Sequence, residues 1–162
     1  MRAIVGALCA LALAAPLASA QGRTEVRSYL EAGMAPHVAR GYAQDRTEPD
    51  LLVVSRERGD PHLWSIYLVA GVNYRVYGAC DDHCSDMDME IYGNDGALVD
   101  RDLSTNDTPF VQITPTVSGR AYVRVWAFAC DPGPCALAAR LMSGGQPEDR
   151  VETGRTVETA PG

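Results

Sequence analysis

The amino-acid sequence predicts an all-β domain, an antiparallel β-sandwich or jelly roll of about eight strands, preceded by a short N-terminal helical segment. Short runs of β-branched and aromatic residues recur between residues 51 and 142, with turn-forming residues between them. The composition is 46% hydrophobic and 22% charged over 162 residues, which is typical of one globular domain rather than a disordered or fibrous chain. Together, these observations favour a small sandwich with a single core.

Each predicted strand ends at residues that favour turns. The predicted strands are residues 51–55, 63–69, 72–79, 86–92, 97–103, 110–114, 121–129 and 136–141. Glycine, proline, asparagine and aspartate supply the turn conformations at 59–61, 94–96 and 131–134. Within 121–129, alternation places Val123, Val125 and Ala127 on the buried face and Arg124 in solvent, and Tyr122 is expected to pack at the end of the sheet.

Two other segments flank the predicted sandwich, which we place at residues 50–142. Residues 21–49 are the predicted helical segment, in which Thr24 is a candidate N-cap and Pro36 is expected to break or restart a helix that reaches about Ala43. The apolar residues of that helix recur near helical spacing at Val26, Tyr29, Leu30 and Met34. Residues 143–162 are polar and are expected to be disordered.

The first 20 residues have the features of a secretory signal peptide. Arg2 supplies positive charge, residues 3–15 are apolar, and Ala18-Ser19-Ala20 is a small-residue cleavage site, so the mature chain is expected to begin at Gln21. The apolar stretch stops at Pro16, short of the roughly 20 residues that a membrane helix needs. We therefore expect a periplasmic or secreted protein with no membrane span in the mature chain.

The charge of the chain excludes one class of partner. All 14 basic residues are arginines, and 21 acidic residues bring the net charge to −7. Binding of nucleic acid depends on neutralising phosphates, so an acidic chain is not expected to bind it. We expect instead an unidentified protein or polysaccharide of the cell envelope.

Four cysteines remain outside the predicted signal peptide, which contains Cys9. An even number in an oxidising compartment favours two disulfides, and turn residues between the members of each pair favour the local pairing Cys80–Cys84 and Cys130–Cys135. The competing interpretations are a crossed pairing of the same cysteines and a four-thiolate zinc site, which the spacing does not exclude. Neither pair has the two-residue spacing of a thiol-exchange motif.

Three motifs follow one another in the strand region. They are LVAGVNYRV at 68–76, DMDMEIY at 86–92 followed by Asp95-Gly96, and SGRAYVRV at 118–125. In order and spacing, this set resembles the bacterial pre-peptidase C-terminal domain. The resemblance covers about residues 50–142 and implies a secreted β-sandwich that serves as an accessory module beside a peptidase, with calcium sites in some related collagen-binding modules. The paired cysteines are a departure from the family pattern.

An acidic cluster lies between residues 81 and 107, where nine carboxylates face a single arginine, Arg101. Such a cluster is either a solvated strand face or a site for a cation such as calcium. A three-residue turn at 94–96 with Gly96 left-handed pairs Ile91 with Val99 and sets Asp88 against Asp102, whereas a two-residue turn sets Asp88 against Arg101. Apolar pairing favours the three-residue turn, and with it a weak structural Ca²⁺ site, for which the candidate ligands are Asp82, Asp86, Asp88, Asp102 and Asp107.

The sequence contains no recognised reaction motif. There is no nucleophile elbow, zinc-protease helix, phosphate loop or dinucleotide fingerprint, and the three histidines share no local motif and are interpreted as surface residues. We therefore expect no enzymatic activity and favour an exported binding or accessory module. The alternatives are a small secreted hydrolase that uses acidic loop carboxylates and a periplasmic inhibitor, for which His83 or the loop at 131–134 has to protrude.

Overall fold

The computed structural model describes residues 15–47 and 49–147. Within these ranges, two helices precede nine strands, and every strand pairing is antiparallel. In chain order the elements are α1 (Ala15–Ala32), α2 (Ala35–Ala39), β1 (Tyr42–Gln44), β2 (Leu51–Arg56), β3 (His62–Leu68), β4 (Tyr74–Cys80), β5 (Cys84–Tyr92), β6 (Leu98–Asp102), β7 (Phe110–Ile113), β8 (Gly119–Cys130) and β9 (Cys135–Gly144).

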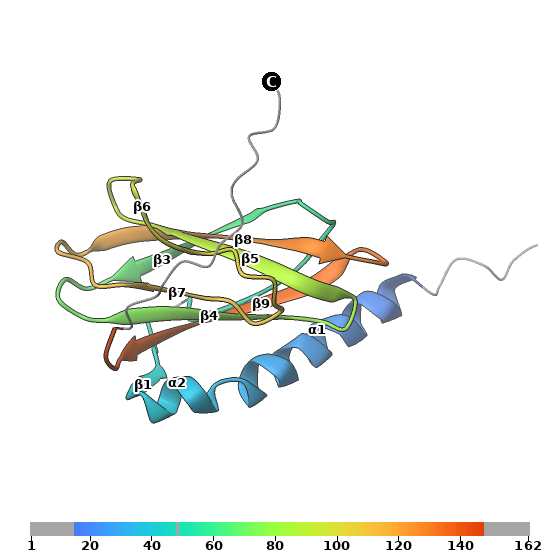
Figure 1. Cartoon of the computed structure of the whole chain (residues 1–162), viewed down its shortest axis with the longest axis horizontal. Coiled ribbons are helices and arrows are strands. Elements are labelled where there is room, and N and C mark those ends of the chain that lie inside the picture. The colour runs from blue at the N-terminus through green and yellow to red at the C-terminus, as the bar shows by residue number, and fades with distance from the viewer. Residues whose placement is uncertain (1–14, 48, 148–162) are drawn as a thin grey trace, which may run out of the picture.

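The strands form two sheets, and helix α1 lies against one of them, so the molecule has three layers (Figure 1). The inner sheet has the order β1-β9-β4-β7, with β2 also paired to β9. The outer sheet has the order β3-β8-β5-β6. The predicted all-β sandwich with a short N-terminal helical segment is therefore confirmed, with one strand more than expected.

The main core lies between the two sheets and is built by alternating residues of each strand. On β8, Val123, Val125 and Ala127 are fully buried, whereas Arg124 is partly exposed, as the alternation predicted. Met87 and Met89 of β5 meet this layer from the neighbouring strand and are also fully buried. The side chains that face inward from the two sheets fill the sandwich as one cluster.

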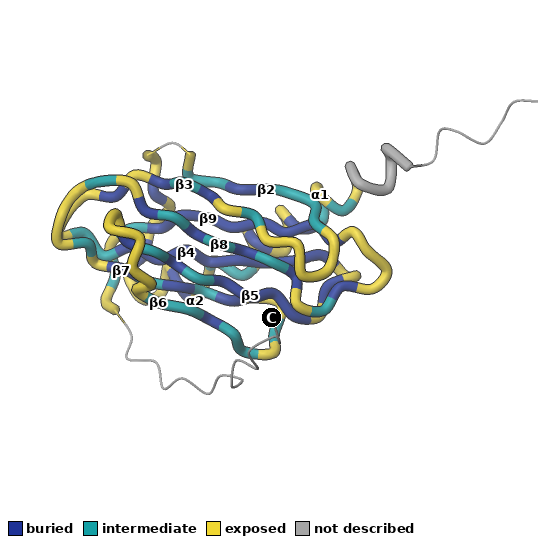
Figure 2. The backbone as a smooth tube through the Cα atoms, turned by 90° about the horizontal axis from the view of Figure 1, so that it is seen from above, coloured by how far each residue is buried: buried dark blue, intermediate teal, exposed yellow. Residues whose placement is uncertain are grey.

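Small residues allow the helix to pack closely on the inner sheet. Val26 and Leu30 of α1 are fully buried against a second cluster that includes Ala79, Ala136 and Ala138 of β4 and β9. Strands β4 and β9 are consequently covered on both faces, and Figure 2 shows dark blue, buried segments where it labels them. None of the helices in the described ranges is both long enough and apolar enough to cross a membrane.

The N-terminal segment differs from its prediction in two places. Helix α1 begins at Ala15, so Thr24 is not an N-cap but lies inside the helix, because the alanine-rich residues before it continue the helical run. The helix does not reach Ala43, because Tyr42–Gln44 forms β1 and pairs with the end of β9. The predicted restart at Pro36 is confirmed, since this proline lies in the first turn of α2. The apolar part of the predicted signal peptide, up to residue 14, and the predicted tail from 148 onward lie outside the described residues.

The β5–β6 hairpin has the predicted turn but not the predicted register. Gly96 is left-handed with φ 79°, and the Gly93 N–H donates to the Ala97 carbonyl at 2.9 Å, as a three-residue turn requires. Tyr92 then pairs with Leu98, but Ile91 pairs with Asp100. A bulge at Val99 therefore shifts the register by one residue, and Asp102 faces Met89 rather than Asp88.

Because of this bulge, the predicted pairing of Asp88 with Asp102 across the hairpin does not form. Glu90 now faces Arg101 across the hairpin. Asp100 and Asp102 turn instead toward β7, where the Gln112 N–H donates to Asp100 Oδ2 at 2.7 Å and the Phe110 N–H donates to Asp102 Oδ2 at 3.1 Å. These N–H groups lie on the side of β7 that has no strand partner, so the two carboxylates cap a sheet edge.

A buried arginine of β4 contacts helix α2 at the C-terminal end of the helical layer. The guanidinium of Arg75 is stacked 4.4 Å from the Tyr42 ring centroid and 4.2 Å from that of Phe110, and its Nη1 donates to His37 Nδ1 at 3.0 Å. His37 is 7% exposed. The interpretation of His37 as a surface residue is therefore wrong, because α2 carries it onto the inner sheet.

The buried side chain of Tyr77 is expected to make the folded protein less stable at alkaline pH. Burial between α1 and the inner sheet, with a smaller effect of the Asp107 charge, raises the pKa of Tyr77 to about 12. In the unfolded chain this pKa is near 10, so Tyr77 stabilises the fold fully below pH 10, and that contribution is lost as pH rises to about 12. We expect Tyr77→Phe to lose less stability over this interval than the wild type.

The measurement is urea unfolding between pH 9 and 12, together with tyrosinate absorbance. The chain has seven tyrosines and no lysine, so tyrosines dominate the titration in this range. Equal alkaline losses in Tyr77→Phe and the wild type would contradict the assignment.

Candidate functional site

The solvent side of the outer sheet carries a surface of aromatic, leucine and arginine side chains. Alternation along β8 directs one set of residues into the core and the other set outward. Helix α1 packs on the inner sheet, against β9, β4 and β2, and so lies on the opposite side of the sandwich. We call the outward set and its neighbours the β8 face: Leu63, Tyr67, Glu90, Tyr92, Tyr122, Arg124, Trp126 and Phe128.

The large side chains of the β8 face remain accessible. Leu63 is 59% exposed, Tyr67 48% and Phe128 44%, although each belongs to a strand of a two-sheet protein. Tyr122 and Trp126 lie between them and are partly exposed. Tyrosine, tryptophan, phenylalanine and arginine are the residue types that are enriched in protein interfaces.

Charged groups at the centre of the β8 face hold one another in place. Arg124 Nη1 donates to Glu90 Oε2 at 3.1 Å, and its guanidinium lies 4.5 Å from the Trp126 ring centroid. The Tyr92 hydroxyl donates to the same Glu90 oxygen at 2.5 Å. Burial, followed by this bond to Glu90, raises the pKa of Tyr92. The rings and the guanidinium are therefore oriented before any partner arrives, which reduces the entropy that binding would cost.

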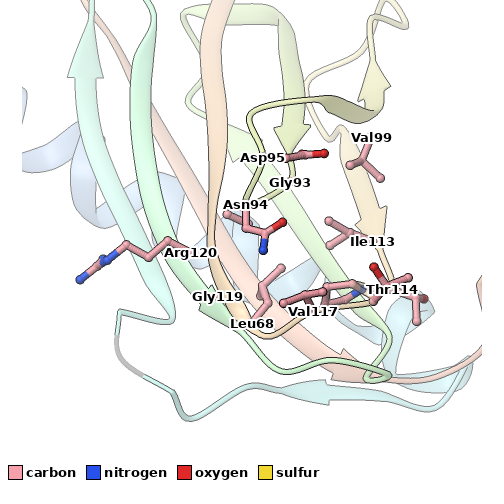
Figure 3. A pocket seen from close by; sticks show the side chains of 13 residues that line it. Leu68, Gly93, Asn94, Asp95, Val99, Ile113, Thr114, Val117, Gly119 and Arg120 are labelled. Carbon is pink, nitrogen blue, oxygen red and sulfur yellow. The ribbon is translucent and has the colours of Figure 1, made fainter.

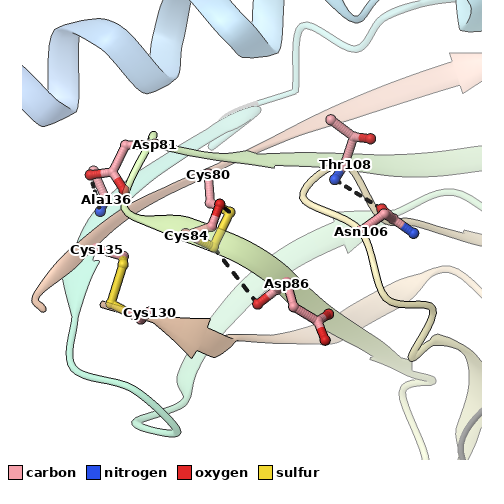
Figure 4. Close-up of a disulfide and its surroundings, with 9 residues drawn as sticks. All are labelled: Cys80, Asp81, Cys84, Asp86, Asn106, Thr108, Cys130, Cys135 and Ala136. Carbon is pink, nitrogen blue, oxygen red and sulfur yellow. Dashed lines mark hydrogen bonds between the residues drawn. A yellow bond between two sulfur atoms is a disulfide. The ribbon is translucent and has the colours of Figure 1, made fainter. Parts of the chain in front are cut away.

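Two disulfides close the end of the sandwich where β5 begins and β8 ends (Figure 4). They join Cys80 to Cys84 and Cys130 to Cys135, so the predicted local pairing is confirmed. The two bridges are neighbours, because Cys84 and Cys130 face each other across β5 and β8. His83 and the loop at 131–134 are exposed at this end, which is the arrangement that the inhibitor alternative requires.

A pocket of about 340 Å³ lies beside these disulfides, between the middle of α1 and the loop that joins β8 to β9. Asp81 lines it and is 5% exposed. Asp81 Oδ2 accepts the Ala136 N–H at 2.8 Å, a bond drawn in Figure 4. Asp81 Oδ1 is buried and receives no hydrogen bond from the described residues.

A second pocket lies at the opposite end of β5 and has a volume of about 230 Å³ (Figure 3). The β5–β6 turn contributes Asn94 and Asp95, and the start of β8 contributes Gly119 and Arg120. Asn94 packs over Gly119, where a Cβ atom would lie 3.4 Å from the Asn94 side chain. Arg120 points away from the pocket in Figure 3, and its Nη1 donates to Ser65 Oγ at 3.0 Å.

The five predicted calcium ligands lie in different surroundings. Asp86 and Asp88 are 2% exposed, whereas Asp82 and Asp107 are exposed. Asp102 is 7% exposed and accepts the N–H groups of Phe110 and Ser104. Asp82 Oδ1 accepts the Tyr29 hydroxyl at 2.8 Å.

The calcium site stays a prediction. In the described ranges, no three of the histidine, cysteine and carboxylate side chains are grouped so as to hold a metal ion. The register from which the site was inferred is wrong, since Asp88 and Asp102 do not face each other. Melting the protein in millimolar Ca²⁺ and again with a chelator tests the prediction directly, because an ion bound to the native state raises the midpoint.

Comparisons with known proteins identify no relative by sequence. No protein-family model and no curated protein matches the chain, so the resemblance to the pre-peptidase C-terminal domain also stays a prediction. Among solved structures, the chain is similar to PliG from Aeromonas hydrophila, a periplasmic lysozyme inhibitor of g-type lysozyme. The TM-score is 0.42 and the identity 14%, over 60% of this chain and 91% of that one. We draw no functional conclusion from a similarity of this size.

Sequence reasoning did not anticipate two features of these surfaces. The alternation along β8 placed Arg124 in solvent and Tyr122 at the end of the sheet, but it also leaves Tyr122, Trp126 and Phe128 accessible on the outer face. The period of two along β8 was a sufficient signal for that face. The burial of Asp81, by contrast, follows from helix α1 packing over the loop after β4, and no local pattern in the sequence reports it.

Proposed function

We propose that the protein is an exported, non-catalytic module that binds a protein partner through the β8 face. The exposure of Leu63, Tyr67 and Phe128 on a sheet face that no described helix or strand covers carries the proposal, because large apolar side chains gathered on one face commonly mark an interaction site. The arginine and tyrosines among them supply polar contacts that suit a protein surface. Support for export comes from the two disulfides, which are typical of oxidising compartments.

The inhibitor alternative uses a different surface of the same molecule. Here the loop at 131–134, whose two ends are joined by the Cys130–Cys135 disulfide, would enter a cleft of the partner together with His83. A loop held in one conformation loses little entropy on binding, and this observation favours the alternative. Both proposals have a protein as the partner, so one experiment distinguishes them.

The experiment locates the partner's contact surface on the folded protein. A photo-crosslinking amino acid is placed at Phe128 on the β8 face, at Val38 on α2 and at Pro132 in the disulfide loop, all of which are exposed. Each protein is exposed to an envelope extract from its own source. We expect crosslinks to one discrete protein from position 128 and none from position 38.

Affinity for the purified partner then gives the energetic test. Leu63→Ser with Phe128→Ser is expected to weaken binding at least 30-fold, about the loss of one interface hot spot. The matched control is Val38→Ser with Val117→Ser, which removes apolar side chains of similar exposure elsewhere and should leave affinity unchanged. Crosslinking only from position 132, with full affinity in Leu63→Ser with Phe128→Ser, would replace the β8 face with the disulfide loop.

A further inference from the structure

The Asp81 carboxylate is only half satisfied, although it is nine-tenths buried. Its Oδ2 atom accepts the Ala136 N–H, but its Oδ1 atom is buried without a donor among the described residues. A buried carboxylate oxygen without a hydrogen bond is costly, and proteins normally supply a donor or an opposite charge. The pocket that Asp81 lines is the place from which such a group would come.

Other residues that line this pocket, beside Ser55 and His83, indicate the chemistry of the missing group. Glu25 of α1 lines the same pocket, so a second carboxylate adds negative potential. Pro132 and Pro134 form an apolar wall opposite the helix. Gly22 places its backbone directly over Asp81, since a Cβ atom at this position would lie 3.0 Å from Asp81 Oδ2. A flat or compact cation with N–H donors and an aliphatic stem fits these three walls.

We propose that this pocket is a binding site for an alkylammonium or guanidinium group, with Asp81 Oδ1 as the acceptor. Glu25 strengthens the attraction, and the two prolines contact the aliphatic stem. This site is separate from the β8 face and does not depend on the function proposed for it.

Two sources can supply that cation. One is a lysine or arginine side chain of a partner. The other is the chain's own α-ammonium group if the signal peptide is removed before Gln21, because Gln21 and Gly22 both line the pocket. The experiment therefore uses the exported protein as cells release it, with its first residue and any blocking group determined by mass spectrometry.

The probes are methylguanidinium and n-butylammonium, titrated while the amide resonances of Gly22 and Ala136 are followed by NMR. The Ala136 N–H is bonded to Asp81, so it reports on that carboxylate directly. We expect saturable shifts in the wild type and at least tenfold weaker binding in Asp81→Asn, whose amide oxygen can still accept the Ala136 N–H. Glu25→Gln should weaken binding by a smaller factor and serves as the second variant if Asp81→Asn does not fold.

Asp131→Asn is the matched control, because it removes one negative charge from an exposed residue of the neighbouring loop that does not line the pocket. It should bind both probes as the wild type does. If the probes bind only after the α-amine has been acetylated, the chain's own terminus is the occupant. Binding that is equal in Asp81→Asn, Glu25→Gln and the wild type, or no binding before and after acetylation, would overturn the proposal.

Discussion

Val125→Asp is expected to prevent the protein from accumulating in folded form. Val125 is fully buried on the inward side of β8, where its strand neighbours are His62 of β3 and Met89 of β5. An aspartate here would place an unpaired charge between the two sheets, at a cost of several kcal/mol. Small domains are stable by only roughly 5–15 kcal/mol, so one such charge removes a large part of the total.

The measurement is soluble yield, followed by thermal unfolding of whatever protein is recovered. Val117→Asp is the matched control, since Val117 is 60% exposed and the same substitution should leave the midpoint nearly unchanged. A Val125→Asp protein that melts at the wild-type temperature would contradict the assignment of this face of β8 to the core.

Asp102→Ala is expected to destabilise the protein by about 2–4 kcal/mol, because two charge-assisted hydrogen bonds are lost. The donors are backbone N–H groups of the partly buried Phe110 and Ser104, and the accepting Asp102 is only 7% exposed. Asp102→Asn keeps one acceptor oxygen and should lose less. The free β7 edge should also make the alanine variant more prone to self-association.

Urea unfolding gives the loss in free energy, and light scattering reports on self-association. Asp95→Ala is the control, because Asp95 also accepts a backbone N–H, that of Ala97, but in an exposed turn where water can replace it. Equal losses in Asp102→Ala and Asp95→Ala would show that Asp102 is a solvated acidic residue, as one interpretation of the sequence held.

The parts of the fold that could be predicted from the sequence are those with a regular alternation of apolar and polar residues or with typical turn residues. Period-two alternation identified the buried side of β8, and turn residues identified the hairpin between β5 and β6. Strand β1 escaped detection because three residues are too few to show a period, and its pairing with β9 is a long-range contact. The end of the predicted helix at Ala43 was wrong for the same reason.

The acidic residues show why the site was harder to predict than the fold. A bulge at Val99 leaves no mark in the sequence, yet it decides whether Asp100 and Asp102 face other carboxylates or the edge of β7. Burial of Asp81 likewise depends on which element packs over it. A local sequence pattern shows that a charged residue lies in a strand. Only the tertiary structure shows which backbone N–H groups donate hydrogen bonds to its side chain.

Strand β9 has a consequence for the time at which the chain can fold. It is the last strand of the described residues, and it pairs with β1, β2 and β4, so it holds most of the inner sheet together. The N-terminal strands of that sheet therefore have no partner until residue 144 has been synthesised. Such a topology delays folding during translation. The inner sheet of such a chain is completed only when its C-terminal strand arrives, so its three N-terminal segments wait for residues that are synthesised last.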